Sequence, residues 1–249
     1  MNDPKIVVMI AVKNGEPWIS KTLKSASEVC KEIVVLDDGS TDNTLEICKS
    51  FNNVADIKIN DINMPFDEAR NCNILVKMAL KRNPDYILAI DHDEILQPDA
   101  KKILFKELLT HPDATVFEFQ ILNIWDKPNM YRVDGHYGNW WQKKLLKMEN
   151  QPKNLFIKNT IYPQNLHCKH IPENARGWYK PVRSNVKILH YGYYDTSTRE
   201  GKFRHYNEIN PNSHKELLEL PGLHSGNYGL EFRYLPKGMF DESIPSSQC

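Results

Sequence analysis

The sequence has few cysteines, no excess of either charge and no long hydrophobic run. Its five cysteines are scattered without a CxxC pair, which is typical of free thiols in a reducing cytosol rather than of a disulfide framework. The 32 basic and 32 acidic residues cancel, so long-range attraction to nucleic acid is not expected. No apolar segment is long enough to span a bilayer. We therefore expect a cytoplasmic protein without a transmembrane segment, whose contact with a membrane, if any, is peripheral.

The sequence also lacks the motifs of two common protein classes. A single glycine, Gly15, follows the first apolar run, so the GxGxxG turn of dinucleotide-dependent oxidoreductases is absent. The string His167-Cys168-Lys169-His170 has no second paired cluster at the spacing of a zinc finger. A dinucleotide enzyme and a structural zinc site are therefore disfavoured.

Short β-rich runs alternate with helical patterns from Lys5 to about Leu122. This alternation predicts βαβ units and a largely parallel sheet within one continuous α/β unit. The expected strands cover residues 6–12, 33–36, 54–59, 86–90 and 115–122. The expected helices between them cover residues 17–29, 44–51, 67–81 and 99–109.

The composition changes after residue 122 to aromatic, proline-broken and histidine-rich sequence that carries all but one of the 11 tyrosines. We expect a last strand over residues 186–190, helical patterns over 198–209 and 213–220, and a weakly ordered tail from Gly238. The chain is thus expected to form two halves of one domain, residues 1–122 and 123–249.

Two carboxylates stand where the fourth expected strand ends. Asp91 and Asp93 follow the run 86–90 directly, and residues two apart in an extended segment point to one side. They can share a cation, or a cation and a sugar hydroxyl, whereas His92 points the other way. The carboxyl ends of strands are where α/β proteins place their chemistry.

A second acidic pair, Asp37 and Asp38, ends the second expected strand at a Gly39 turn. A carboxylate there can accept a hydrogen bond from a nucleobase N–H, or it can cap the helix that follows. The loop 11–16 after the first strand can line the same edge. Arg70, on the first turn of the helix 67–81, can neutralise a diphosphate or lie solvated at the surface.

Four strings occur in the order IAVKNGEPWI, IVVLDDGSTDNT, DEARN and ILAIDHDEIL, within residues 5–96. In this order and spacing the chain resembles the family 2 glycosyltransferases, which are inverting enzymes of the GT-A fold that use nucleotide-diphosphate sugars. The stretch 189–193, LHYGY, followed by Lys202 and Tyr206, is similar to the C-terminal HyGy region of bacterial-type members. The resemblance implies a GT-A fold, Rossmann-like with a mostly parallel central sheet flanked by helices. It also implies that residues 1–122 bind the nucleotide sugar and that residues 123–249 form an aromatic-rich acceptor region.

The resemblance further implies roles for individual residues. Asp38 would hold the nucleobase, Arg70 would lie near the base or the diphosphate, and Asp91 would face the ribose and sugar. The full set of implied donor-binding residues is Ala11, Val12, Asn14, Glu16, Asp37, Asp38, Arg70, Asp91, His92 and Lys202. Uridine is the favoured base, with guanosine and thymidine left open.

The resemblance implies a metal site as well. Asp93 and His190 would ligate a Mn2+ or Mg2+ ion that bridges the diphosphate oxygens and acts as a Lewis acid on the leaving nucleotide. Mn2+ is preferred because Mg2+ disfavours imidazole ligands. The alternative for His190 is a buried core histidine between Leu189 and Tyr191.

Inversion requires a general base that removes the acceptor's proton on the face opposite the leaving group. No acid of the chain matches a family motif for this role, and the candidates downstream of Asp93 are Glu118, Asp126 and Asp134. We favour Asp134, which lies in a polar and aromatic loop, whereas Glu118 lies inside a strand pattern. His136 is an outside candidate.

Aromatic side chains near Tyr137 are expected to face the acceptor. Trp140 and Trp141 are adjacent in an extended segment, so they point opposite ways and only one of them is expected to stack on an acceptor sugar. Core packing is the expectation for the other tryptophan.

The favoured function is metal-dependent, inverting transfer of a sugar from a nucleotide-diphosphate donor to a glycan, lipid-linked or protein acceptor. One alternative is a non-catalytic protein of the same fold that binds a sugar nucleotide or a glycan. This alternative stays open because the sequence does not identify the general base. A sugar nucleotidyltransferase would carry a glycine- and basic-rich first loop, unlike AVKNGEPW. A Mg2+-binding receiver-like domain would leave residues 123–249 unexplained.

Overall fold

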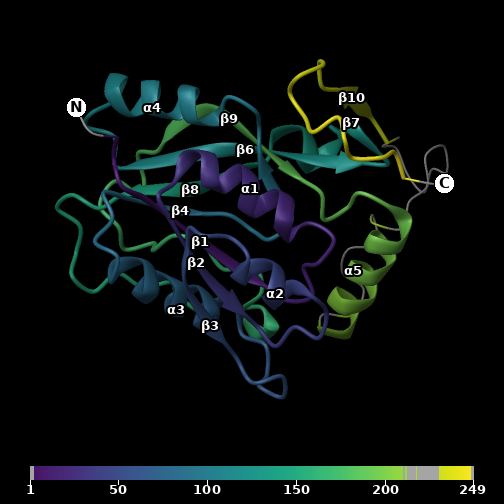
Figure 1. The fold of residues 1–249 in the computed structure, drawn as a ribbon, viewed down its shortest axis with the longest axis horizontal. Coiled ribbons are helices and arrows are strands. Elements are labelled where there is room, and N and C mark those ends of the chain that lie inside the picture. Colours follow the sequence, from purple (N-terminus) through teal and green to yellow (C-terminus); the bar gives the residue numbers. More distant parts are fainter. Residues whose placement is uncertain (1–2, 210, 212–216, 218–229, 248–249) are drawn as a thin grey trace.

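The computed structural model describes residues 3–209, 211, 217 and 230–247, with a 10-stranded sheet at its centre (Figure 1). The strand order along the main path is β10-β7-β6-β8-β4-β1-β2-β3, while β9 pairs with β6 and β5 pairs with β9. The strands are β1 Ile6–Val12, β2 Glu32–Asp37, β3 Val54–Ile59, β4 Tyr86–Ala89, β5 Glu94–Leu96, β6 Val116–Trp125, β7 Lys127–Arg132, β8 Trp141–Lys147, β9 Val182–His190 and β10 Phe232–Tyr234. The helices are α1 Ile19–Val29, α2 Thr44–Lys49, α3 Glu68–Leu80, α4 Ala100–Thr110 and α5 Thr196–Ile209, with short 3-10 helices at Gly135–Asn139 and Pro163–Asn165.

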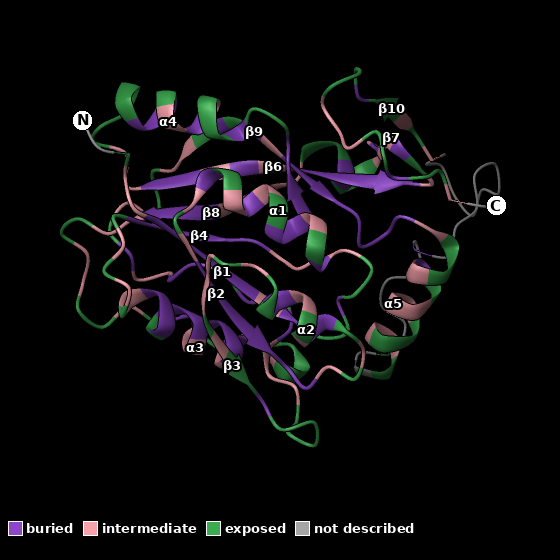
Figure 2. Cartoon of the chain, in the orientation of Figure 1, coloured by how far each residue is buried: buried purple, intermediate pink, exposed green. Residues whose placement is uncertain are grey.

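Strands β4, β1, β2 and β3 run parallel; β4, β1 and β2 form the buried centre of the fold, whereas β3 lies at the sheet edge and is partly exposed. β1 is buried along nearly its whole length because helices cover both faces of the sheet (Figure 2). Ile6, Val8 and Ile10 pack with α1 and α4, whereas Val7 and Met9 pack with α3 on the opposite face. This arrangement confirms the expected α/β class with helices flanking the central sheet.

Strand β6 joins the two halves of the chain. It runs antiparallel to β8 and parallel to β9, and β7 and β10 extend the sheet beyond it with antiparallel pairing. Residues 122 and 123, the limit expected between the halves, lie inside β6. The second half therefore completes the sheet that the first half begins.

The sequence patterns locate most elements to within a few residues. The strand expected at 186–190 extends back to Val182 because its earlier residues pair with β6. Strand β8 has no clear strand pattern, since its sequence WQKKLLK places charged residues between the apolar ones. Of the helical pattern expected at 213–220, only residue 217 lies within the described part.

The expectation of a weakly ordered tail from Gly238 is wrong for the residues up to 247. Ile244 is buried, Asp241 accepts from Lys21 Nζ at 2.9 Å, and Ser247 N donates to Asp126 O at 2.8 Å. The polar composition of the tail hides this order because backbone groups and a few side chains make the contacts.

The strand register brings three chain segments to one edge of the sheet. Val12 lies beside Asp37 in the parallel pair β1–β2, and Met9 lies beside Ala89 in the parallel pair β1–β4. Asp38 N also donates to Val12 O at 2.8 Å. Because the three strands run in the same direction, the residues that follow them emerge together.

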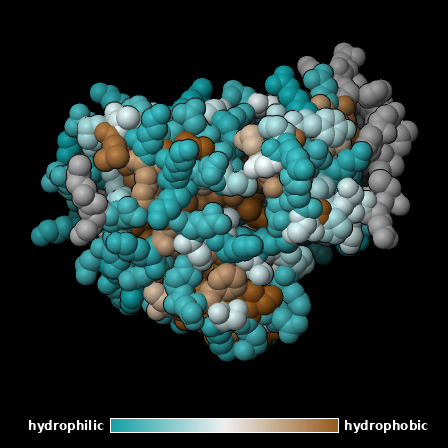
Figure 3. Space-filling view, turned by 45° about the horizontal axis from the view of Figure 1, so that its top comes forward, coloured by the Kyte–Doolittle hydropathy of each residue, from teal (hydrophilic) through white to brown (hydrophobic). Residues whose placement is uncertain are grey.

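The face of the molecule in Figure 3 is mostly hydrophilic, and its hydrophobic residues form small patches. The exposed large hydrophobic residues include Ile62 and Ile161, with exposed fractions of 55% and 95%. Within the described ranges, no helix combines the length and the apolar character needed to cross a bilayer.

Candidate functional site

The Asp37-Asp38 turn presents two buried carboxylate oxygens that lack hydrogen-bond partners. Asp38 Oδ1 accepts from Asn60 Nδ2 at 2.5 Å, and Asp37 Oδ1 accepts from Ser40 N at 2.7 Å. The other oxygen of each carboxylate, Oδ2, is buried and unpaired. Buried acceptors without partners are rare in native proteins. These two oxygens therefore have no hydrogen-bond donor within the described part of the protein.

Two asparagines and one arginine hold Asp38 in place. Asn60 Nδ2 also lies 3.1 Å from Asn71 Oδ1, which accepts from Arg70 Nη2 at 3.1 Å. Arg70 Nη2 lies 3.8 Å from Asp38 Oδ1. The Arg70 side chain is one-third exposed, so its guanidinium borders the open side of the turn.

The first loop is fastened to this turn by its own polar groups. Asn14 adopts φ 51°, its N–H donates to Ser40 Oγ at 2.9 Å, and its Oδ1 accepts from Thr41 N at 2.8 Å. Glu16 Oε1 accepts from Asn43 Nδ2 at 2.7 Å. The side chains of Asn14 and Glu16, both expected at the donor, thus hold the loop against the turn. Ala11 and Val12 lie in β1, where Val12 is buried.

The ring of His92 lies against the first loop. A Cβ atom on Gly15 would come within 3.1 Å of His92 Cδ2 and 2.5 Å of Val12 Cγ2. His92 O accepts from Thr22 Oγ1 of α1 at 2.8 Å. Gly15 thus lets the first loop pass beside the His92 ring.

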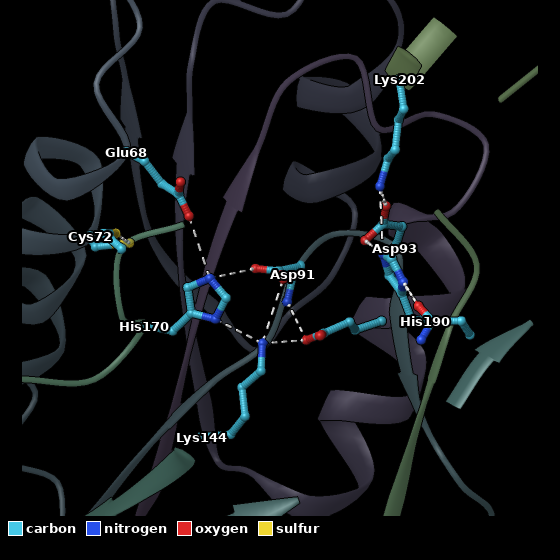
Figure 4. Close-up of polar contacts among 11 residues, drawn as sticks. Glu68, Cys72, Asp91, Asp93, Lys144, His170, His190 and Lys202 are labelled. Atoms are coloured by element: carbon cyan, nitrogen blue, oxygen red, sulfur yellow. Dashed lines mark hydrogen bonds and ion pairs between the residues drawn. The ribbon is translucent and has the colours of Figure 1, made fainter. Parts of the chain in front are cut away.

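A buried lysine, Lys144 of β8, anchors Asp91 (Figure 4). Its Nζ lies 2.8 Å from Glu94 Oε2, 3.5 Å from Asp91 Oδ2 and 2.9 Å from His170 Nδ1. Glu94 Oε2 also accepts from Asp91 N at 2.8 Å. The Lys144 side chain is fully buried, whereas that of Asp91 is 40% exposed. Asp91 is therefore the member of the cluster that can reach a ligand.

His170 completes this charge cluster from the opposite side. Its Nε2 lies 3.8 Å from Asp91 Oδ1 and 3.6 Å from Glu68 Oε1. Burial lowers the pKa of His170, but Asp91 and Glu68 outweigh it and raise the pKa to about 9. Burial likewise opposes ionisation of Asp91, yet His170 and Lys144 hold its pKa well below the usual range. Asp91 is thus an anion held between the Lys144 ammonium and the His170 ring.

Asp93 and His190 lie together where β5 pairs with β9. Asp93 Oδ1 lies 3.5 Å from His190 Nε2, and Asp93 Oδ2 lies 2.9 Å from Lys202 Nζ. His190 Nδ1 lies 2.7 Å from Asn123 Oδ1, so the Nδ1 hydrogen is directed to Asn123 and Nε2 faces Asp93. Although burial raises the pKa of Asp93, Lys202, His190 and His92 hold it well below its usual value.

The residues around Asp93 suit a divalent cation. A Cβ atom on Gly192 would contact Asp93 Oδ2, His190 Nε2 and Lys202 Nζ, so the glycine leaves a small space lined by polar atoms. A carboxylate and an imidazole are ligands that Mn2+ accepts. Within the described residues, no group of three or more His, Cys, Asp and Glu side chains could hold a metal. An ion here would therefore need further ligands from a bound molecule.

Each of the three candidate bases is paired with an arginine. Glu118 Oε1 accepts from Arg183 at 2.8 Å, and Asp126 Oδ1 accepts from Arg199 at 2.9 Å. Asp134 accepts from Arg132 through both oxygens, at 2.9 Å and 2.8 Å. Burial raises the pKa of Asp134, but the hydrogen bonds from Arg132 outweigh this effect and lower it overall.

The two adjacent tryptophans face different surroundings, as expected, but the expectation of core packing for the tryptophan away from the acceptor is wrong: Trp140 packs against the core, and Trp141 is half-buried. The ring of Trp140 lies 6.3 Å from that of His190 and 5.8 Å from that of His136, both edge to face. Trp141 instead lies beneath the cations of Arg183 and Lys187, at 4.7 Å and 5.2 Å. Trp140 is therefore the tryptophan that borders the site.

Several residues of the site do not emerge from sequence patterns. They are Asn60, Glu68, Asn71, Asn123, Lys144 and His170. The one available signal is Lys144, a lysine directly followed by the apolar pair Leu145 and Leu146. His170 belongs to the His-Cys-Lys-His string, and its partners are distant in sequence.

We expect Lys144→Met to lower the free energy of unfolding by about 3–5 kcal/mol, because Glu94 and Asp91 would lose their buried cation. Lys143→Met in the same strand is the matched control, with a change of about 1 kcal/mol or less. Urea denaturation of both variants measures the difference. Equal losses in the two would contradict the role assigned to Lys144.

The raised pKa of His170 predicts a pH dependence of stability. Because folding favours the protonated ring, its contribution is fully present below pH 6.5 and is lost as the pH rises through about 9. The free energy of unfolding should fall over this interval in the wild type and change less in His170→Gln. Urea denaturation at several pH values tests this, and parallel profiles for the two proteins would refute it.

Comparison with known proteins places the chain in a family. The family model for glycosyl transferase family 2 matches residues 7–170, more than half of the chain. Glycosyltransferase SunS of Bacillus subtilis (strain 168) is 26% identical over 219 residues, which are 87% of this chain and 46% of the relative. The dTDP-rhamnosyl transferase RfbG of Shigella flexneri is 38% identical over 99 residues, which are 37% of this chain and 34% of the relative. The chain thus spans about half or less of the length of these curated relatives.

A solved structure is also similar. The crystal structure of S. aureus TarS, residues 1–349, aligns with 15% identity and a TM-score of 0.48. The alignment covers 86% of this chain and 69% of that chain.

Proposed function

The chain belongs to glycosyltransferase family 2, and we propose that it moves a sugar from a nucleotide-diphosphate donor to a glycan, lipid-linked or protein acceptor, with inversion. A UDP-sugar is the favoured donor, and Mn2+ is favoured over Mg2+. One observation carries the proposal: the site residues lie at strand ends that meet at one edge of the sheet. The register of β1, β2 and β4 brings together the unpaired oxygens of Asp37 and Asp38 and the anchored Asp91, and the pairing of β9 with β5 adds the Asp93–His190 pair.

The unpaired oxygens of Asp37 and Asp38 support recognition of a pyrimidine base. Uracil and thymine each carry one N3–H donor, which a buried carboxylate oxygen can accept. A relative that is named as a dTDP-rhamnosyl transferase agrees with such a base. Arg70, beside Asp38 and partly exposed, would reach the base or the diphosphate.

Asp93 and His190 would hold the divalent cation. When bound, the ion would neutralise charge on the leaving nucleotide diphosphate. Asn123 orients His190 so that Nε2 faces the proposed site, which is the role of an outer hydrogen-bond partner in metal sites. The imidazole ligand is the reason for preferring Mn2+.

Asp91 would accept hydrogen bonds from ribose or sugar hydroxyl groups. Lys144 and His170 keep its carboxylate ionised and restrict its rotation, which suits it to position a donor. Trp140, which borders His190, would offer its ring to an acceptor sugar.

Binding of nucleotides to the purified chain tests the proposal. Isothermal titration calorimetry with UDP, dTDP and GDP, each with Mn2+, with Mg2+ or with EDTA, should give the tightest binding for UDP with Mn2+. Release of UDP from UDP-sugars by slow hydrolysis then separates an enzyme from a protein that only binds the donor. An absence of binding to every nucleotide would reject both functions.

Asp93→Asn should reduce the Mn2+-dependent gain in UDP affinity by at least about tenfold, because the ion loses its carboxylate ligand. The exposed Asp113, changed to Asn, is the matched control and should behave as the wild type. The same calorimetric titration measures both variants. Unchanged metal dependence in Asp93→Asn would show that the ion binds elsewhere.

We keep Asp134 as the proposed general base. Its lowered pKa keeps it ionised at neutral pH, and the pair with Arg132 must open before it can take a proton. Asp134→Asn should leave UDP binding intact and slow UDP release from the donor by about a hundredfold or more. Release at nearly the wild-type rate would exclude Asp134 and direct the same test to Glu118 and Asp126.

A further inference from the structure

The ammonium group of Lys202 lies between the two proposed metal ligands. It extends from α5 toward Asp93 (Figure 4), with Nζ 2.9 Å from Asp93 Oδ2 and 3.5 Å from His190 Nε2. This Nζ forms an ion pair with the buried Asp93 carboxylate, so the positive charge of the lysine lies at this carboxylate. The ammonium group of Lys202, carried by α5, thus already lies beside the Asp93 carboxylate at the edge of the sheet.

This position is the one that a metal ion would need. Asp93 Oδ1 and His190 Nε2 are 3.5 Å apart, close enough for one ion to bind both at ordinary ligand distances of about 2.0–2.2 Å. The space beside Gly192 is bounded by Asp93 Oδ2, His190 Nε2 and Lys202 Nζ. An ion within it would lie in contact with the ammonium group, and two cations repel strongly at that distance.

We propose that Lys202 is a tethered competitor of the divalent cation, so that the ion binds firmly only together with the nucleotide diphosphate. The identities of the cation and the nucleotide rest on the proposed function. Without a nucleotide, Lys202 neutralises the buried Asp93 and excludes the ion. A bound diphosphate supplies oxygen ligands for the ion and a new anionic partner for Lys202.

The lysine stem makes this exchange feasible. Lys202 has four flexible carbons between the helix and the ammonium group, and 26% of its side chain is exposed. It can therefore turn from Asp93 to a phosphate without movement of β9. Because metal and nucleotide would each weaken the hold of Lys202 on Asp93, each would promote the binding of the other.

Titration of the nucleotide-free full chain with Mn2+ tests the proposal, with free aquated Mn2+ followed by electron paramagnetic resonance. Lys202→Met, which keeps the length of the side chain and removes its charge, should bind Mn2+ at least about tenfold more tightly than the wild type. Lys202→Arg keeps the charge and should bind Mn2+ as weakly as the wild type. Arg204→Met, an exposed position on the same helix, is the matched control and should also match the wild type.

Two further measurements locate the effect. The double variant Asp93→Asn, Lys202→Met should lose the tighter Mn2+ binding, because the gain depends on the Asp93 carboxylate. UDP should tighten Mn2+ binding severalfold less in Lys202→Met than in the wild type, since the competitor is already gone. Circular dichroism of every variant verifies that the fold is retained.

Nucleotide-free Mn2+ binding that is unchanged or weaker in Lys202→Met would overturn the proposal. A second outcome would also overturn it: a wild type that binds UDP as tightly in EDTA as in Mn2+, together with loss of UDP binding in Lys202→Met. The lysine would then take the place of the ion rather than compete with it. A wild type that binds no nucleotide would refute the proposed function alone. The nucleotide-free Mn2+ titrations of the wild type and Lys202→Met would still decide whether Lys202 competes with the ion.

Discussion

The burial of the Lys144 ammonium against Glu94 and Asp91 is the interaction on which the geometry of the site depends. It ties β8, from the second half of the chain, to the segment that follows β4 in the first half. A buried charge is tolerated only when its partners are held close. The position of Asp91 is therefore fixed by a strand whose sequence gives little sign of being a strand.

Other carboxylates at this edge of the sheet are also paired with cations. The carboxylates there come from the first half of the chain, and most of the cations that face them, Lys144, His170 and Lys202, come from the second half. Arg70, from α3, is the counterpart near Asp38. The charges at this edge are thus balanced in pairs of carboxylates and cations.

Much of the site follows from the sequence. The carboxylates of Asp37, Asp38, Asp91 and Asp93 directly follow apolar runs, and the parallel register of β1, β2 and β4 brings these runs together. The resemblance to glycosyltransferase family 2 is confirmed by the match over residues 7–170. His190 was also found from sequence, and it lies beside Asp93 because β9 pairs with β5.

The partners of these residues could not be found in the same way. Lys144 and His170 are 53 and 79 positions from Asp91, beyond the reach of any local pattern, since Asp91 is residue 91 and the others are 144 and 170. The sequence by itself determined the alternation of strands and helices and the carboxylates at the strand ends, because hydrophobic periodicity and turn residues act locally. Only the tertiary structure decided which cation meets which carboxylate. That choice depends on the pairing of β8 with β4 and of β9 with β5, and on the placement of α5 beside them.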